Sequence, residues 1–190
     1  MENPEKNYTD NRNTTDINDK VTEWLAKQFK TQNWNITDML RTQNATVYLL
    51  IWPIMEQNIF KGFMQAKDIV PKSEMMGCYF DEMGSEKLVR YFYDRYQDKD
   101  KYKSLVNSKK CYRFMEDVLA KDFEILSGTE KMILMMTVVF RYRNNIFHGN
   151  KAIGEWIKYS KEIEFCTEFM MSVVDVYKKH FTDSTIEPEQ

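Results

Sequence analysis

Residues 140 to 150 read Phe-Arg-Tyr-Arg-Asn-Asn-Ile-Phe-His-Gly-Asn and follow the most apolar run of the chain, Met132 to Phe140, in which Thr137 is the only polar residue. This pattern predicts a buried helix that ends in two arginines, two asparagines and a histidine. A helix end that only had to reach solvent would be served as well by Lys, Glu or Gln, which have high helix propensity. The concentration of hydrogen-bonding and proton-transferring groups next to Gly149 therefore indicates a functional site.

The helical repeat determines which of these side chains can meet. Residues advance about 100° each, so Asn144 and His148 are stacked neighbours, and Arg141 returns to nearly the same face about two turns before His148. Arg143 lies about 140° from His148 and reaches it only if the helix loosens, which Gly149 would allow, or if a second subunit brings the groups together. A histidine near a helix C-terminus also complements the helix dipole, so a purely structural role stays open.

The segment Arg143-Asn144-Asn145-Ile146-Phe147-His148 resembles the R-x4-H signature of the HEPN superfamily, in the variant with a polar residue after the arginine. Extended by Gly149, it looks most like HEPN domains of bacterial phage-defence, abortive-infection and toxin–antitoxin systems. Beyond the motif, the similarity is architectural: an all-helical domain with the motif in its penultimate helix. The resemblance implies metal-independent cleavage of RNA that leaves a 2′,3′-cyclic phosphate, without a cofactor. It also implies a homodimer in which motifs from both subunits line one cleft.

The composition favours one helical domain in a reducing compartment. The chain has 190 residues, enough for one well-buried domain, and its six Gly and four Pro argue against a sandwich of strands joined by many tight turns. A net charge of −2 excludes a global basic field, so nucleic acid would bind to a local patch. The three cysteines have no metal-ligand spacing, and we find no membrane-spanning stretch or signal region. We therefore expect a cytoplasmic protein.

We predict an all-α fold, a single-domain helical bundle of about five to six helices. Residues 1–16 are expected to be a disordered lead-in, residues 17–181 the domain, and residues 182–190 a flexible tail. Apolar periodicity predicts helices over residues 18–30, 37–63 with a kink at Pro53, 86–97, 109–126, 128–148 and from about 153 to 180.

Two stretches lack this periodicity, and one helix start has a local signature. Residues 64–85 contain Pro71, Gly77 and Gly84 and are predicted to form an irregular excursion that could include a short helical turn. Residues 98–103 are predicted to be a solvated charged turn. Ser127 and Glu130 have the spacing of a capping box, which predicts that the motif helix begins near Gly128.

The aromatic and basic residues of the helix predicted over 86–97 have two interpretations. Arg90, Arg95 and the tyrosines beside them could provide stacking and phosphate contacts to single-stranded RNA. An amphipathic helix packed by its aromatic side chains is the simpler interpretation.

The available residue types suit RNA cleavage better than the common alternatives. The chain has no phosphate-binding or dinucleotide-binding glycine loop and no H-E-x-x-H, and its two histidines exclude a histidine-rich metal site. RNA supplies its own nucleophile, the 2′-hydroxyl. His148 is then the candidate acid–base group, Arg143 the cation for the phosphate, and Asn144 an orienting or phosphate-binding amide. Supporting RNA contacts are predicted for Arg141, Asn145 and Lys151. Single-helix geometry favours Arg141, and family spacing Arg143, as the catalytic arginine.

The function predicted from these residues and the resemblance is a dimeric endoribonuclease that acts as a toxin or phage-defence effector on cellular or phage RNA. An antitoxin or regulatory protein is a possible further partner. The alternative is a non-catalytic HEPN module that binds RNA, a nucleotide or a partner protein with the same helix end. In a third interpretation the motif is purely structural, with Arg143 and Asn144 bonded to buried carbonyls and His148 capping the helix.

Overall fold

The computed structural model describes residues 21–24, 26–27, 44–106, 112–147 and 158–182. The chain divides into two compact units, residues 1–42 and 43–190, so the boundary falls inside the predicted domain of residues 17–181. In the first unit, residues 21–24 and 26–27 are helical. The predicted lead-in, the predicted helix start at Thr37 and most of the predicted tail lie outside the described residues.

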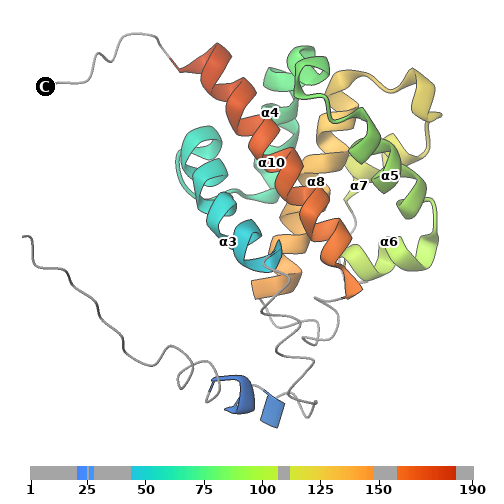
Figure 1. The fold of residues 1–190 in the computed structure, drawn as a ribbon. Helices are drawn as coiled ribbons and strands as arrows, with labels where there is room; N and C mark the ends of the chain where they lie inside the picture. Colours follow the sequence, from blue (N-terminus) through green and yellow to red (C-terminus); the bar gives the residue numbers. More distant parts are fainter. Residues whose placement is uncertain (1–20, 25, 28–43, 107–111, 148–157, 183–190) are drawn as a thin grey trace, which may run out of the picture. The chain divides into compact units, whose positions relative to one another are not determined.

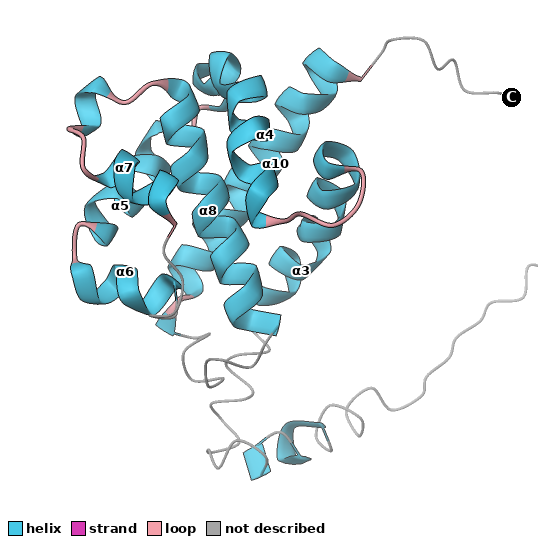
Figure 2. Cartoon of the chain, turned by 180° about the vertical axis from the view of Figure 1, so that it is seen from behind, coloured by secondary structure: helices cyan, strands magenta, loops and turns pink. Residues whose placement is uncertain are grey.

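The all-α prediction is confirmed, because the described part of the chain contains helices and no strand (Figure 2). The second unit has more α-helices than the five or six predicted. In chain order its elements are α3 (Asn44–Met55), the π-helix η1 (Glu56–Phe60), the 3-10 helix η2 (Ala66–Asp68), α4 (Ile69–Met76), the 3-10 helix η3 (Gly77–Met83), α5 (Glu86–Tyr96), α6 (Lys99–Val106), α7 (Arg113–Leu119), the 3-10 helix η4 (Phe123–Ile125), α8 (Gly128–Phe147) and α10 (Ser160–Phe181).

Helix α8 is the central element of this unit (Figure 1). It contacts α4, η3, α5, α6, α7 and α10. Every residue from 132 to 139 is buried, including Thr137, whose hydroxyl donates to the carbonyl of Ile133 at 2.7 Å. A helix that is apolar all round is stable in water only when neighbours cover all its faces, and this requirement explains the surrounding helices.

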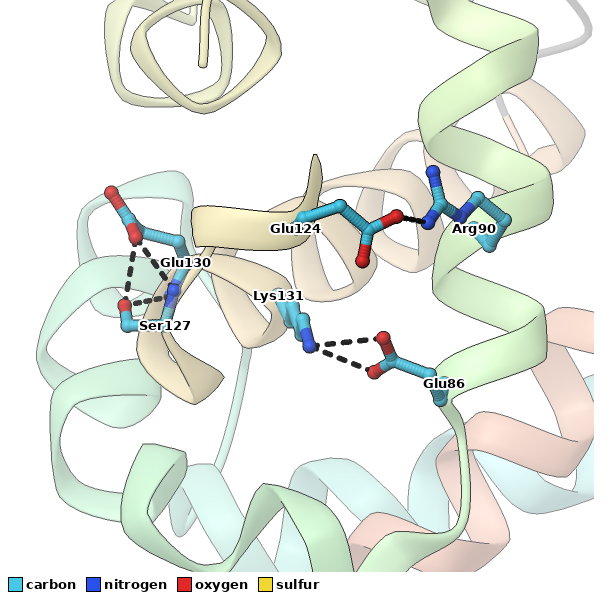
Figure 3. A network of polar contacts seen from close by, with 6 residues as sticks. All are labelled: Glu86, Arg90, Glu124, Ser127, Glu130 and Lys131. Atoms are coloured by element: carbon cyan, nitrogen blue, oxygen red, sulfur yellow. Dashed lines mark hydrogen bonds and ion pairs between the residues drawn. The ribbon is translucent and has the colours of Figure 1, made fainter. Parts of the chain in front are cut away.

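The N-terminal end of α8 is held by polar contacts (Figure 3). The predicted capping box is confirmed: the Ser127 N–H donates to Glu130 Oε2 at 2.9 Å, and the Glu130 N–H donates to Ser127 Oγ at 3.3 Å. Lys131 pairs with Glu86 of α5 at 2.9 Å, and Arg90 of α5 pairs with Glu124 of η4. These contacts fix where α8 begins and join its first turns to α5.

Two glycines allow α8 to approach η3 closely. A Cβ atom on Gly128 would lie 2.2 Å from the carbonyl oxygen of Gly77, and one on Gly77 would lie 2.2 Å from Oγ1 of Thr129. Both distances are far below van der Waals contact. The crossing therefore requires glycine at each position.

Two predictions of irregular structure are wrong. Most of residues 64–85 is helical, in η2, α4 and η3, because buried Ile69, Met76 and Phe80 anchor short helical segments against the core. The predicted charged turn at 98–103 is mostly the start of α6. There Asp98 Oδ1 accepts the N–H groups of Asp100 and Lys101 at 2.9 and 3.1 Å. The bond from the Lys101 N–H, then that from Asp100, lowers the pKa of the Asp98 carboxyl.

The other helix boundaries agree closely with the sequence. Helix α5 matches the predicted segment 86–97 within one residue at each end, and α8 begins at Gly128 as predicted. The end predicted for α8 at His148 lies outside the described residues. Pro53 lies inside α3, which continues to Met55 and passes directly into the π-helix η1, so the kink predicted at Pro53 stays a prediction. The predicted segment 109–126 is divided into α7 and η4, and the predicted start of the last helix near residue 153 lies outside the described residues.

Replacing Gly128 with alanine should destabilise the protein by about 1–3 kcal/mol, because the new methyl group overlaps the backbone of Gly77. Urea unfolding followed by circular dichroism measures the change. Lys87→Ala, at an exposed position of α5, is the control and should change stability by less than about 0.5 kcal/mol. Equal stability of the two variants would show that the close crossing is unimportant.

Candidate functional site

The predicted site lies at the C-terminal end of α8, where several helix ends meet (Figure 1). Helix α3 begins beside the start of α10: Asn44 Nδ2 donates to Ser160 Oγ at 3.0 Å and to the Ser160 carbonyl at 3.3 Å. Tyr142 of α8 packs edge-on against Tyr159, which precedes α10, with ring centroids 6.2 Å apart. The last described turns of α8 are therefore bordered by α3 and by the start of α10.

Arg141 and Asn145 form a buried hydrogen-bond network with the end of α6. Arg141 Nε and Asn145 Nδ2 both donate to the Leu105 carbonyl at 3.1 Å, and Arg141 Nη2 donates to Asn145 Oδ1 at 3.1 Å. Arg141 Nη1 also donates to the Tyr112 hydroxyl at 3.4 Å. Carbonyls in the last turn of a helix have no partner within that helix, so α8 supplies the donors that the Leu105 carbonyl needs.

This burial gives two predicted RNA-binding residues a different role. Arg141 is 5% exposed and Asn145 is 6% exposed, and the contacts of both are internal. A guanidinium committed to a buried carbonyl cannot reach a phosphate without breaking the network. We therefore assign Arg141 and Asn145 a supporting role that joins α6 and Tyr112 to α8, and the RNA contacts predicted for these two residues stay untested.

Arg143 and Asn144 are partly exposed on other faces of the same turn. Arg143 Nη1 donates to Asn144 Oδ1 at 3.1 Å, and the guanidinium carbon lies 5.5 Å from the ring centre of Trp52 in α3. Because a guanidinium only donates, this contact fixes the amide so that Oδ1 faces Arg143 and Nδ2 is the donor for a ligand. The pair thus presents a permanent positive charge and an oriented amide at the end of α8.

The remaining predicted residues of the site lie outside the described part of the chain. These are His148 and Lys151, together with Gly149, the residue predicted to end the helix. The pairing of Arg143 with His148 and the phosphate contact of Lys151 therefore stay predictions.

Tyr48 of α3 supports the backbone one turn before Arg143. Its hydroxyl donates to the carbonyl of Val139 at 2.8 Å, the carbonyl that faces the Arg143 N–H in a regular helix. Burial raises the pKa of the Tyr48 phenol well above its usual range, so the group stays a donor at neutral pH. The sequence pattern places Tyr48 in an apolar stripe and gives no sign of this partner.

A second polar cluster, also unforeseen, joins α5 to the start of α10. Glu162 is 5% exposed, pairs with Arg95 at 2.9 Å and accepts the Tyr91 hydroxyl at 2.7 Å. Burial, followed by the hydrogen bond to Glu162, raises the pKa of Tyr91 to about 12, so this phenol also remains protonated. The only sequence signal was the mixture of basic and aromatic residues in α5.

Two other features are absent from the described residues. No helix there is long and apolar enough to cross a membrane. The same residues contain no group of three or more His, Cys, Asp or Glu side chains arranged to hold a metal ion.

Comparison with protein-family models, curated proteins and solved structures finds no match to this chain. Any functional conclusion therefore depends on the motif and on the geometry described above.

Exchanging arginine for methionine at two neighbouring positions separates the supporting role from the exposed one. Arg141→Met should lower the free energy of unfolding by about 3 kcal/mol, because it removes donors from buried Leu105 and Asn145. Arg143→Met should cost about 1 kcal/mol, because this partly exposed side chain loses its contact with Trp52 and its hydrogen bond to Asn144 at a site open to water. Urea unfolding of both variants measures the difference, and a larger loss for Arg143→Met would contradict the assignment.

Proposed function

We propose that the chain is a metal-independent endoribonuclease of HEPN type that acts as a toxin or phage-defence effector in the cytoplasm. The observation that carries the proposal is that the polar residues at the end of α8 fall into a buried pair and a partly exposed pair. Arg141 and Asn145 are buried in a supporting network, whereas Arg143 and Asn144 are bonded to each other and partly exposed. Arg143 and Asn144 are also the residues that match the motif ending at His148.

In the proposed reaction, the 2′-hydroxyl of the RNA attacks the adjacent phosphate and the 5′-oxygen leaves, which produces a 2′,3′-cyclic phosphate. Arg143 binds the phosphate oxygens and stabilises the charge that develops on them. His148 transfers a proton at the 2′-oxygen or at the leaving 5′-oxygen. Asn144, whose Oδ1 is held by Arg143, donates through Nδ2 to the phosphate or to the imidazole.

The geometry supports Arg143 over Arg141 as the catalytic arginine. The donors of Arg141 are directed to the Leu105 carbonyl, the Tyr112 hydroxyl and Asn145. Arg143 is the more exposed of the two, and it retains the family spacing to His148.

We further propose that two copies of the chain meet through α3, which contains no charged residue. Val47, Leu50 and Ile54 lie on one face of this helix and are 38%, 64% and 43% exposed. Such an uncharged apolar face fits a second copy of itself better than it fits RNA. Trp52, the α3 residue beside Arg143, is buried on the opposite side of the helix from this face.

His148→Ala should abolish cleavage of total cellular RNA in the presence of EDTA, with a loss of about 10²–10⁴-fold in rate, because acid–base catalysis is removed. Denaturing gel electrophoresis of the RNA measures it. His180→Ala is the matched control and should keep full activity, since His180 stacks on Tyr79 and contacts Glu82 at 3.0 Å in the last turn of α10. Full activity of His148→Ala would refute the proposed mechanism. Binding of RNA without turnover by the wild type would favour the non-catalytic module.

Leu50→Glu should convert the dimer to a monomer, because it places charge in the centre of the proposed apolar contact. Light scattering after size-exclusion chromatography reports the mass. Ile125→Glu introduces the same change at a residue of η4 that is 70% exposed, and this variant should remain dimeric. A dimer that survives Leu50→Glu would exclude this face of α3 as the contact.

A further inference from the structure

Helix α5, the start of α10 and the two residues just before it carry a surface of basic and aromatic side chains, here called the α5–α10 face. It consists of Tyr91, Arg95, Lys158, Tyr159, Lys161 and Phe165. The two lysines are exposed, and the arginine and the three rings are partly exposed. This face is separate from the motif residues discussed above.

The cations of this face lie against its rings. Lys161 Nζ is 4.7 Å from the ring centre of Tyr91 and 5.3 Å from that of Phe165. Lys158 Nζ is 5.7 Å from the ring centre of Tyr159, and the Arg95 guanidinium carbon is 5.6 Å from the same ring. Each ring therefore has a positive charge beside it, and the exposed lysines are long enough to turn toward a phosphate while a base takes the ring face.

The rings are held in place by contacts with each other and with the buried side chain of Glu162. Tyr91 and Phe165 pack edge to face, with centroids 5.0 Å apart and planes at 89°. The Tyr91 hydroxyl and Arg95 share the buried carboxylate of Glu162. A ligand would thus meet rings that are already ordered, which reduces the entropy lost on binding.

The charge of this face is positive although the chain as a whole is slightly negative. Arg95, Lys158 and Lys161 outweigh the single buried carboxylate, Glu162. The exposed carboxylates of Asp94 and Glu164 each lie about 80° round their helices from the centre of the face, whereas exposed Glu168 lies on the same side of α10, two turns after Lys161.

We propose that the α5–α10 face binds single-stranded RNA and leads it to the end of α8. The partly exposed rings stack on unpaired bases, which a duplex does not offer, while the lysines neutralise backbone phosphates. Tyr159 joins the two regions, because its ring packs edge-on against Tyr142, the residue before Arg143. This inference rests on the proposed ribonuclease function and names the form of RNA that the site receives.

The test measures binding with an RNA that cannot be cleaved. A fluorescein-labelled 12-nucleotide RNA, 2′-O-methylated throughout, is titrated with the full-length wild-type chain and followed by anisotropy at several salt concentrations. The variant Lys158→Glu/Lys161→Glu should bind at least about tenfold more weakly, and the slope of log K against log salt should fall by about 1.4, or about 0.7 for each lost phosphate contact. Lys67→Glu/Lys72→Glu, with the same change of charge on η2 and α4, should keep the wild-type slope.

A second variant separates stacking from charge. Tyr159→Leu should weaken binding by about fivefold or more without changing the salt slope, since stacking on a ring involves no counterion release. Circular dichroism checks that each variant folds. The same RNA annealed to its complement should bind more weakly than the single strand.

Equal affinities for the two lysine double variants, or equal binding of single strand and duplex, would overturn the proposal. Different results would refute the proposed ribonuclease function and the proposed RNA-binding face. Binding through this face without any cleavage of unmodified RNA would support the proposed binding face and refute the proposed ribonuclease activity. If the lysine substitutions change neither cleavage nor binding, the proposed ribonuclease activity would stand and the proposed binding face would be refuted.

Discussion

The need to bury α8 on every side is the constraint on which the rest of the second unit depends. All residues from 132 to 139 are buried, so neighbouring helices must cover each face of the helix. Its N-terminal end is fixed by the capping box of Ser127 and Glu130 and by the close crossing of Gly77 and Gly128. With that end fixed, the position of the C-terminal turns relative to α3, α6 and α10 is determined.

At those C-terminal turns, apolar packing is replaced by hydrogen bonds. The carbonyl of Leu105 is satisfied by Arg141 and Asn145, which couples the end of α6 to α8 at two positions one turn apart. The rotation of the helix then directs Arg143 and Asn144 away from this network, toward α3 and solvent. One short segment thus supplies both the buried support of the site and the partly exposed pair Arg143 and Asn144. This separation is the physical basis of the proposed activity.

The sequence predicts the helices that depend on local signals. It does not predict helices or side-chain roles that depend on contacts with residues far away in the sequence. Periodicity and the capping box locate α5 and α8 closely. Helix α6 was missed because its stability comes from the Asp98 cap and from burial of Leu105 and Val106, not from a long apolar stripe. The supporting role of Arg141 is likewise hidden in the sequence, because its partner is a carbonyl 36 positions away, which no helical repeat can reveal. The distinction between Arg141 and Arg143 required the tertiary structure.

In the proposed reaction the RNA's own 2′-hydroxyl is the nucleophile and no metal takes part, so the chemical ends of the products distinguish it from other mechanisms. A defined single-stranded RNA is incubated with the wild-type protein in EDTA, beside the same RNA carrying 2′-O-methyl groups, and the fragments are analysed by mass spectrometry. The proposed mechanism predicts fragments that end in 2′,3′-cyclic phosphate from the unmodified RNA and no fragments from the methylated RNA. Cleavage of the methylated RNA, or products with 5′-phosphate and 3′-hydroxyl ends, would contradict it.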